Sequence, residues 1–198
     1  FLIGSLFLIL ANTVLNIGDS NVPRVITDFS LKEKITPASL YPLGYNYSVP
    51  TDKWSISDQA CDYVFVNDNA IDFEIPGTLG IIHSHKTWLT VKSKERRYPF
   101  INANEYIKDV ERHSVLNFVY ACIGDMTIEL IEALKKDKTV VLFIDTYNNH
   151  GSAEQRKIFV DLINNKCNTP VVIGRVYNDL PIEKLQLDAA TDIGALLI

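Results

Sequence analysis

Cysteine is scarce in this sequence of 198 residues, which contains only Cys61, Cys122 and Cys167. The number is odd, the three residues lie far apart, and no C-x-x-C pair occurs. This argues against both a disulfide framework and a local zinc site. We therefore interpret the three residues as free buried thiols of a cytoplasmic protein.

The sequence also lacks an excess of basic residues. Its 19 lysines and arginines stand against 24 acidic residues, which gives a formal net charge of -5. The basic residues are scattered, so no positive field is available to attract a phosphate backbone. We predict that nucleic acid is not a partner.

No apolar run is long enough for a membrane span. The candidate run begins at Phe1 and, continued to Ile17, is shorter than the ~20 residues that a spanning helix needs. Asparagine and threonine interrupt its second half, and no basic residue precedes it, as a signal peptide would require. For residues 1–22 the pattern alone predicts a core helix that ends near Gly18, and no membrane association.

Common catalytic loops are missing as well. The chain contains no G-x-G-x-x-G or G-x-x-x-x-G-K-[ST] phosphate loop and no G-x-S-x-G nucleophile elbow. The sequence therefore gives no support for a dinucleotide-binding enzyme, a P-loop NTPase or an α/β-hydrolase.

What the sequence does contain is an alternation of apolar strands and amphipathic helices. Strands are predicted at 23–29, 62–66, 78–82, 117–123, 139–144, 170–174 and 195–198. Helices are predicted at 127–136, 152–165 and 181–191, with further starts at Thr36 and Thr51, a helical turn at 106–110 and an exposed charged loop at 92–97.

Strands that are apolar throughout indicate a parallel sheet covered by βαβ units. We predict one α/β domain over residues 1–198, a (β/α) barrel-like domain that is complete or incomplete. The alternative is an open doubly wound parallel sheet. A chain that lacks an initiator Met and stops inside its last predicted strand is expected to be a fragment of a larger enzyme.

In either architecture, ligand groups lie just beyond the carboxyl ends of the strands. The polar residues predicted there are Asp28, His83, His85, Asp125, Asp145, His150 and Arg175. The set is mixed, and capping and turn roles account for most of it. We predict no catalytic residue and no metal ligand from it, and keep it as a candidate polar cluster.

His83-Ser84-His85 at a strand end is the sharpest local signal. Strand alternation would place both imidazoles on one face, where they could share a zinc ion. Two ligands fall short of the three that a catalytic zinc needs, so two solvated histidines are the simpler interpretation. The alternative function is a self-contained metal-dependent hydrolase of barrel type that uses His83 and His85.

Five stretches resemble the long form of 4-hydroxy-3-methylbut-2-enyl diphosphate synthase, the GcpE or IspG family. They are KITPASLYPLGY at 34–45, DKWSISDQACD at 52–62, FEIPGTLGII at 73–82, NHGSAEQR at 149–156 and LQLDAATDIGALLI at 185–198. The long form inserts an extra barrel-like domain between its catalytic barrel and its iron-sulfur domain. The resemblance implies that this chain is that insert.

The family reductively opens a methylerythritol cyclodiphosphate in non-mevalonate isoprenoid biosynthesis, using a [4Fe-4S] cluster held by three cysteines and a glutamate in another domain. Its closely spaced cluster cysteines are missing here, so the resemblance implies no cofactor and no catalysis in this chain. It implies a scaffolding role beside the catalytic barrel and iron-sulfur domains of the same parent chain, in a cytoplasmic homodimer. It leaves open whether the insert binds a ligand.

Overall fold

The fold is built on a parallel sheet of seven strands in the order β1-β4-β5-β6-β7-β8-β9, with a separate antiparallel hairpin of β2 and β3. The computed structural model describes residues 11–148, 151–177 and 181–194. The strands are β1 Ile26–Asp28, β2 Tyr45–Ser48, β3 Lys53–Ile56, β4 Tyr63–Asn67, β5 Gly80–Ser84, β6 Arg97–Asn102, β7 Asn117–Ala121, β8 Val140–Ile144 and β9 Val171–Ile173.

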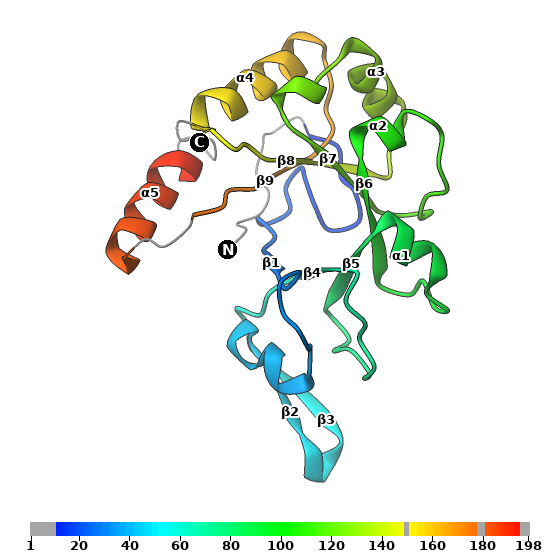
Figure 1. Ribbon diagram of the computed structural model, residues 1–198, viewed down its shortest axis with the longest axis vertical. Coiled ribbons are helices and arrows are strands. Elements are labelled where there is room, and N and C mark those ends of the chain that lie inside the picture. The colour runs from blue at the N-terminus through cyan, green and yellow to red at the C-terminus, as the bar shows by residue number, and fades with distance from the viewer. Residues whose placement is uncertain (1–10, 149–150, 178–180, 195–198) are drawn as a thin grey trace.

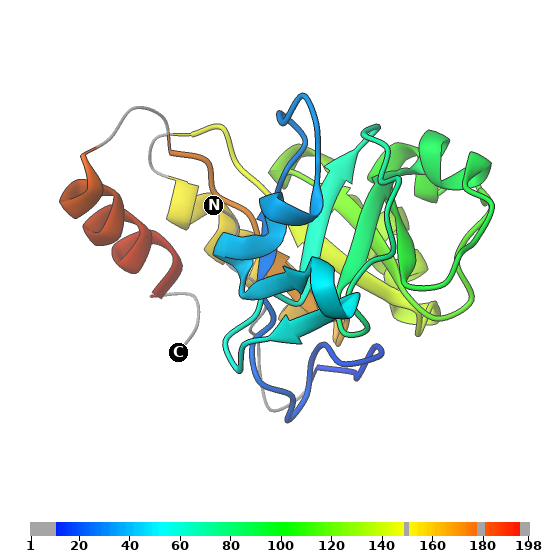
Figure 2. The same cartoon turned by 90° about the horizontal axis from the view of Figure 1, so that it is seen from below.

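Helices cover the convex side of this sheet, and the hairpin projects from it (Figure 1). The helices are η1 Pro37–Leu43, η2 Val49–Thr51, α1 His85–Thr90, α2 Ala103–Tyr106, η3 Ile123–Asp125, α3 Ile128–Lys136, α4 Gly151–Asn164 and α5 Ile182–Gly194. Figures 1 and 2 both show α5 on the far side of β9, away from α1 to α3. The sheet curls into a half-barrel, which confirms the predicted α/β class and fits an incomplete barrel or an open sheet.

Aromatic rings fill the concave side of the half-barrel. Tyr63 on β4, Tyr98 on β6 and Phe118 on β7 form one layer of this inner core. The rings of Tyr63 and Phe118 lie 5.6 Å apart and those of Tyr63 and Tyr98 lie 6.0 Å apart. A second layer, one step nearer the carboxyl ends, consists of Phe65, Phe100, Tyr120 and Phe143.

Gly80 gives the inner rings their space. A Cβ atom built on Gly80 would lie 2.5 Å from Cδ1 of Tyr63 and 3.1 Å from Cε2 of Tyr98. We expect Gly80→Ala to lower the free energy of unfolding by about 1–3 kcal/mol, because the rings must leave their rotamers to admit a methyl group. Urea denaturation measures the loss. Gly77→Ala is the matched control, since its Cβ would meet nothing within 4 Å, and an equal loss in both variants would contradict this packing argument.

The final third of the chain follows its predicted pattern. In α3, Thr127 caps the helix by accepting a hydrogen bond from the Leu130 backbone N–H, and the helix buries Leu130, Ile131 and Leu134. The residues that follow the strand and helix patterns from 117 to 191 form β7, α3, β8, α4, β9 and α5, within a few residues of the predicted bounds.

Three predictions in the first half are wrong. Thr51 starts no α-helix, because the chain reverses at Asp52, with φ of 51°, and forms the β2–β3 hairpin. Arg97 belongs to β6 and not to the predicted exposed loop. Residues 11–18 are not helical; Val14 and Ile17 bridge across a tight turn that packs into the inner core.

Several predicted features lie outside the described residues, namely the strand at 195–198, His150 and most of the apolar run at the N-terminus. Within residues 11–148, 151–177 and 181–194, no helix combines the length and the apolar character of a membrane span.

Candidate functional site

A cavity of about 440 Å³ opens at the carboxyl ends of the strands, on the concave side of the half-barrel. We call it the mouth cavity. Its floor is the second aromatic layer of Phe65, Phe100, Tyr120 and Phe143. The polar residues around it are Asp28, Ser30, Asn67, Ser84, His85, Lys86, Asn102, Glu105, Asp145 and Tyr147. An apolar floor with a polar rim, at the strand ends of a parallel sheet, is the usual composition of a small-molecule site.

The four floor rings pack against one another. The centroid of Phe100 lies 4.7 Å from that of Phe65, 5.7 Å from that of Tyr120 and 5.2 Å from that of Phe143. The Tyr120 hydroxyl lies 2.9 Å from the Tyr147 hydroxyl. Burial raises the pKa of Tyr120, so this phenol stays protonated and can donate a hydrogen bond.

Much of the polar rim is unengaged. Within the part of the chain that the structure describes, the side chains of Asn67, Lys86, Asn102 and Glu105 make no hydrogen bond or ion pair. The imidazole of His85, by contrast, lies with Nε2 2.8 Å from the Glu111 carbonyl oxygen. The rim therefore has both donors and acceptors available to a ligand.

The rim carries more negative than positive charge. Asp28, Glu105 and Asp145 face one lysine, Lys86. Asp28 accepts a hydrogen bond from the Ser30 backbone N–H at 2.7 Å, and Asp145 accepts one from the Thr146 backbone N–H at 2.7 Å. Such a mouth is electrostatically unsuited to a multiply charged anion.

Asp145 is a rim carboxyl whose ionised form is disfavoured by burial. Burial raises its pKa, and the Thr146 backbone N–H and the Arg175 charge offset only part of that effect. A raised carboxyl pKa means that folding disfavours the ionised form, so the stability cost appears as the pH rises above the unfolded value of about 4.

We therefore expect Asp145→Asn to raise the midpoint of thermal unfolding at pH 7 and to leave it almost unchanged at about pH 3, where the carboxyl of the unfolded chain is already protonated. Differential scanning calorimetry at the two pH values measures this. If Asp145→Asn were less stable than the unaltered chain at pH 7, the contacts of the carboxylate would contribute more to stability than its burial costs.

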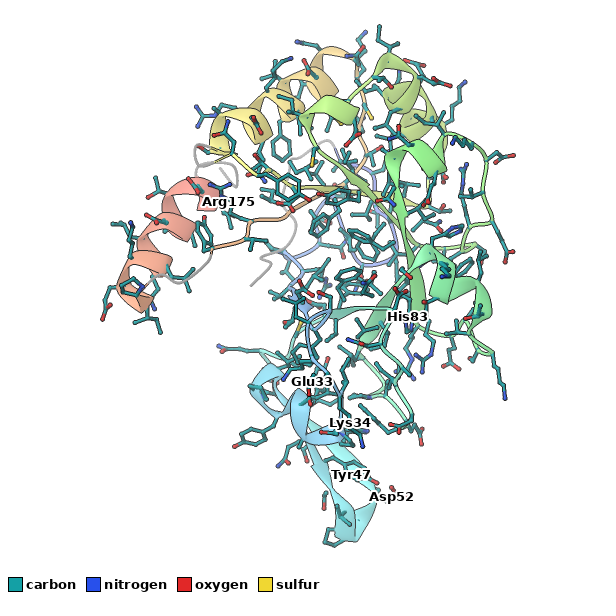
Figure 3. The ribbon with its side chains drawn as sticks, viewed as in Figure 1. Glu33, Lys34, Tyr47, Asp52, His83 and Arg175 are labelled. Atoms are coloured by element: carbon teal, nitrogen blue, oxygen red, sulfur yellow. The ribbon has the colours of Figure 1, made fainter. Side chains whose placement is uncertain are left out.

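The mouth cavity brings together three residues of the predicted strand-end cluster, Asp28, His85 and Asp145. Asp125 is elsewhere, capping η3 by accepting a hydrogen bond from the Cys122 backbone N–H at 2.8 Å. Arg175 is a buried structural tie: its Nε donates to Asp192 on α5 at 3.1 Å. Figure 3 shows it far from His83.

The expectation that His83 and His85 share one face is wrong. Strand β5 ends at Ser84 and His85 opens α1, so the alternation stops between the two histidines. His85 lines the mouth cavity, whereas His83 lines a different cavity beside Arg97. Within the described residues, no group of three or more His, Cys, Asp and Glu side chains could hold a metal ion.

The three thiols are free, with Cys61 and Cys167 buried and Cys122 partly buried. Cys61 and Cys167 come before strands β4 and β9, whereas Cys122 follows β7. Since all the strands of the seven-stranded sheet are parallel, Cys122 lies at the opposite end of the sheet from Cys61 and Cys167, and the three thiols cannot join in binding one cluster.

The aromatic floor is the part of the site that sequence reasoning missed. Tyr63 and Phe65, Tyr98 and Phe100, and Phe118 and Tyr120 repeat one pattern, two aromatics two residues apart, in three strands. The repeat marks one shared face of the sheet, and it is the signal that could have identified the floor.

The fold and the mouth cavity define an α/β half-barrel with a cavity of small-molecule size at its strand ends. No protein-family model matches the chain, and no solved structure matches it. Two curated proteins do, and both are named 4-hydroxy-3-methylbut-2-en-1-yl diphosphate synthase (flavodoxin).

The protein from Parabacteroides distasonis is 29% identical over 137 residues, which is 69% of this chain and 22% of that protein. The protein from Phocaeicola vulgatus is 32% identical over 100 residues, 50% of this chain and 16% of that protein. These similarities support a relation between the chain and this family of synthases, of whose length the chain spans only a minor part.

Proposed function

We propose that the chain is one region of a 4-hydroxy-3-methylbut-2-enyl diphosphate synthase, an oxidoreductase of non-mevalonate isoprenoid biosynthesis. The parent enzyme would reductively convert 2-C-methyl-D-erythritol 2,4-cyclodiphosphate into 4-hydroxy-3-methylbut-2-enyl diphosphate. The observation that carries this proposal is the similarity to two curated proteins of that name, over 69% and 50% of the chain.

Within that enzyme, the region acts as a scaffolding insert and not as the site of catalysis. The electrostatics of the mouth cavity support this role. A cyclodiphosphate carries several negative charges, whereas the rim presents Asp28, Glu105 and Asp145 against Lys86. Like charges at close range repel in a partly buried site, so the substrate belongs in another region of the parent.

The [4Fe-4S] cluster of the parent is likewise assigned to another region. The cluster needs several thiolates within reach of one another, and the residues present do not fit it. The Cys61 thiol, before β4, donates to the Tyr63 carbonyl oxygen and lies 3.1 Å from the Thr27 hydroxyl. It is far along the strand direction from Cys122, which follows β7.

As a scaffold, the region would contact the catalytic barrel and the iron-sulfur domain of its own parent chain, in a cytoplasmic homodimer. Exposed apolar side chains on the projecting part of the fold offer a surface for such a contact. Tyr41 on η1 is 68% exposed and Val49 on η2 is 77% exposed, and both line a cavity of about 460 Å³ next to the hairpin.

The purified chain of 198 residues tests the non-catalytic role. After anaerobic reconstitution with iron and sulfide, we expect a folded, colourless protein with no turnover of the cyclodiphosphate, while the full-length parent prepared in parallel is coloured and active. Stoichiometric iron and sulfide in the chain alone, or turnover by it, would refute the assignment of chemistry to other regions.

A further inference from the structure

A third cavity, of about 430 Å³, lies on the convex face of the sheet, next to α1. We call it the outer cavity. His83 and Arg97 line it, and they alternate along β5 and β6 with Ile82 and Tyr98, which point into the inner core. The mouth cavity and the outer cavity are therefore on opposite faces of the same strands.

Arg97 is a partly buried cation that lines the outer cavity. Its Nη1 donates to Nε2 of His83 at 3.2 Å, and among the described residues no acidic side chain forms an ion pair with it. A guanidinium has five N–H donors in a planar fork, and the hydrogen bonds among the described residues give an acceptor only to the Nη1 group of Arg97. Burial, and then the Arg96 charge, lowers the pKa of Arg97, which is the effect of an uncompensated positive charge.

His83 stands behind Arg97 and is itself buried, with 1% of its surface exposed. Because arginine has no acceptor, Nε2 of His83 must accept the hydrogen bond, which leaves the hydrogen on Nδ1. Nδ1 makes no hydrogen bond of normal geometry within the described residues. The backbone carbonyl of Asn67 nevertheless favours the protonated ring and so raises the pKa of His83. Burial and the Arg97 charge outweigh that effect and lower the pKa of His83 to about 4, so near neutral pH the ring is uncharged.

The remaining charges around the outer cavity also favour an anion. Asp68 is the one acidic side chain among the lining residues, and its Oδ1 is already engaged by the hydroxyls of Ser84 and Thr87. Lys92, exposed at the rim, makes no ion pair within the described residues. Arg97 and Lys92 therefore exceed Asp68 by one positive charge.

We propose that the outer cavity binds the oxyanion group of a small molecule, a phosphate or a carboxylate, on the guanidinium of Arg97. A planar guanidinium matches the paired oxygens of either group. Lys92 and the Ser93 hydroxyl lie at the rim of the cavity, where they can contact the rest of the ligand. This site is independent of the identity of the parent enzyme.

The imidazole nitrogens of His83 report on the site. In ¹⁵N-labelled chain near pH 7, inorganic phosphate and acetate are titrated in separate arms, with sodium chloride at matched ionic strength as the reference. We expect one or both anions to shift the His83 resonances to saturation, and to raise the pKa of His83, because an anion beside Arg97 compensates its charge. The arm that saturates identifies the group as phosphate or carboxylate.

Arg97→Gln removes the charge and should weaken the anion affinity by about tenfold or more, since hydrogen bonds to charged groups are among the stronger ones. Arg156→Gln is the control, because it makes the same charge change at an exposed position of α4, and it should leave the affinity unchanged. Arg97→Lys keeps the charge but removes the planar guanidinium, so it should weaken the anion affinity by less than Arg97→Gln does. It serves as the test if the glutamine variant does not fold.

Two results would overturn the proposal. One is the absence of a saturating His83 shift with either phosphate or acetate in the unaltered chain. The other is a shift that sodium chloride reproduces, or that Arg97→Gln and Arg156→Gln both retain with the affinity of the unaltered chain.

Discussion

Phe118→Ala is expected to lower the free energy of unfolding by about 3–5 kcal/mol. The Phe118 side chain is fully buried and packs edge-to-face against Tyr63 in the layer that fills the half-barrel. The surrounding rings belong to several strands of a rigid sheet, so they cannot collapse into the space that the substitution leaves. Urea denaturation, followed by near-ultraviolet circular dichroism, measures the loss.

Tyr147→Ala is the matched control for Phe118→Ala, because Tyr147 is 86% exposed. Its removal should change stability by no more than about 0.5 kcal/mol. A loss below about 1 kcal/mol for Phe118→Ala would mean that the concave side of the sheet is not a close-packed core and that the half-barrel is held together mainly by its convex side.

The second large effect is a pH dependence of the free energy of unfolding, which arises from His83. Burial, reinforced by Arg97, depresses the pKa of this histidine from 6.5 to about 4. Between these two pH values the histidine is protonated in the unfolded chain but not in the folded chain, so the free energy of unfolding decreases as the pH falls from 6.5 towards 4. At 1.36 kcal/mol for each pKa unit, the loss approaches about 3 kcal/mol.

Chemical denaturation at intervals between pH 7 and pH 4 measures the His83 effect. His83→Gln should remove most of the pH dependence in this range, while His85→Gln, at the partly exposed neighbouring position, should retain it. An unaltered dependence in His83→Gln would show that other groups carry the effect and that the His83 ring accepts a proton in the folded state at little cost.

The parts of the fold that could be predicted are those in which one physical pattern dominates. Strands β7, β8 and β9 are buried on both faces, and the helices between them bury one regular stripe, as Leu130, Ile131 and Leu134 do in α3. Both patterns are short in range and visible in the residue order, so the βαβ alternation and the α/β class followed from them.

Strand β6 could not be predicted because its local signals oppose its structure. Charged residues at 92–97 lead directly into it, and Pro99 stands in its middle, where proline is rarely tolerated. Its position between β5 and β7 comes from tertiary packing, which places Tyr98 and Phe100 in the inner core. The hairpin of β2 and β3 was hidden similarly, because the turn at Asp52 contains no glycine.

The candidate site was likewise predicted only in part. The rule that ligand groups follow the carboxyl ends of parallel strands correctly selected Asp28, His85 and Asp145. The same rule selected His83 and Arg175, which the structure buries elsewhere, because a residue number near a strand end does not reveal which face the side chain occupies. For His83 that face depends on where β5 stops, and strand ends are the least reliable part of a sequence prediction.

Electrostatics separates the two cavities. At the rim of the mouth cavity the carboxylates outnumber the single lysine, whereas the outer cavity holds a guanidinium without an ion-pair partner among the described residues. This contrast supports the proposal that the region does not hold the diphosphate substrate at its strand ends, and it is consistent with the anion site proposed on the opposite face.

The central proposal, a scaffolding region within a reductive synthase, is tested most directly by excising this region from the full-length parent and rejoining the flanking chain through a flexible linker. We predict that the excised protein still binds its full complement of iron and sulfide but loses turnover of the cyclodiphosphate, because the other regions are no longer held at a working distance. Undiminished turnover would contradict the scaffolding role, and loss of the iron-sulfur cluster would contradict its assignment to another region.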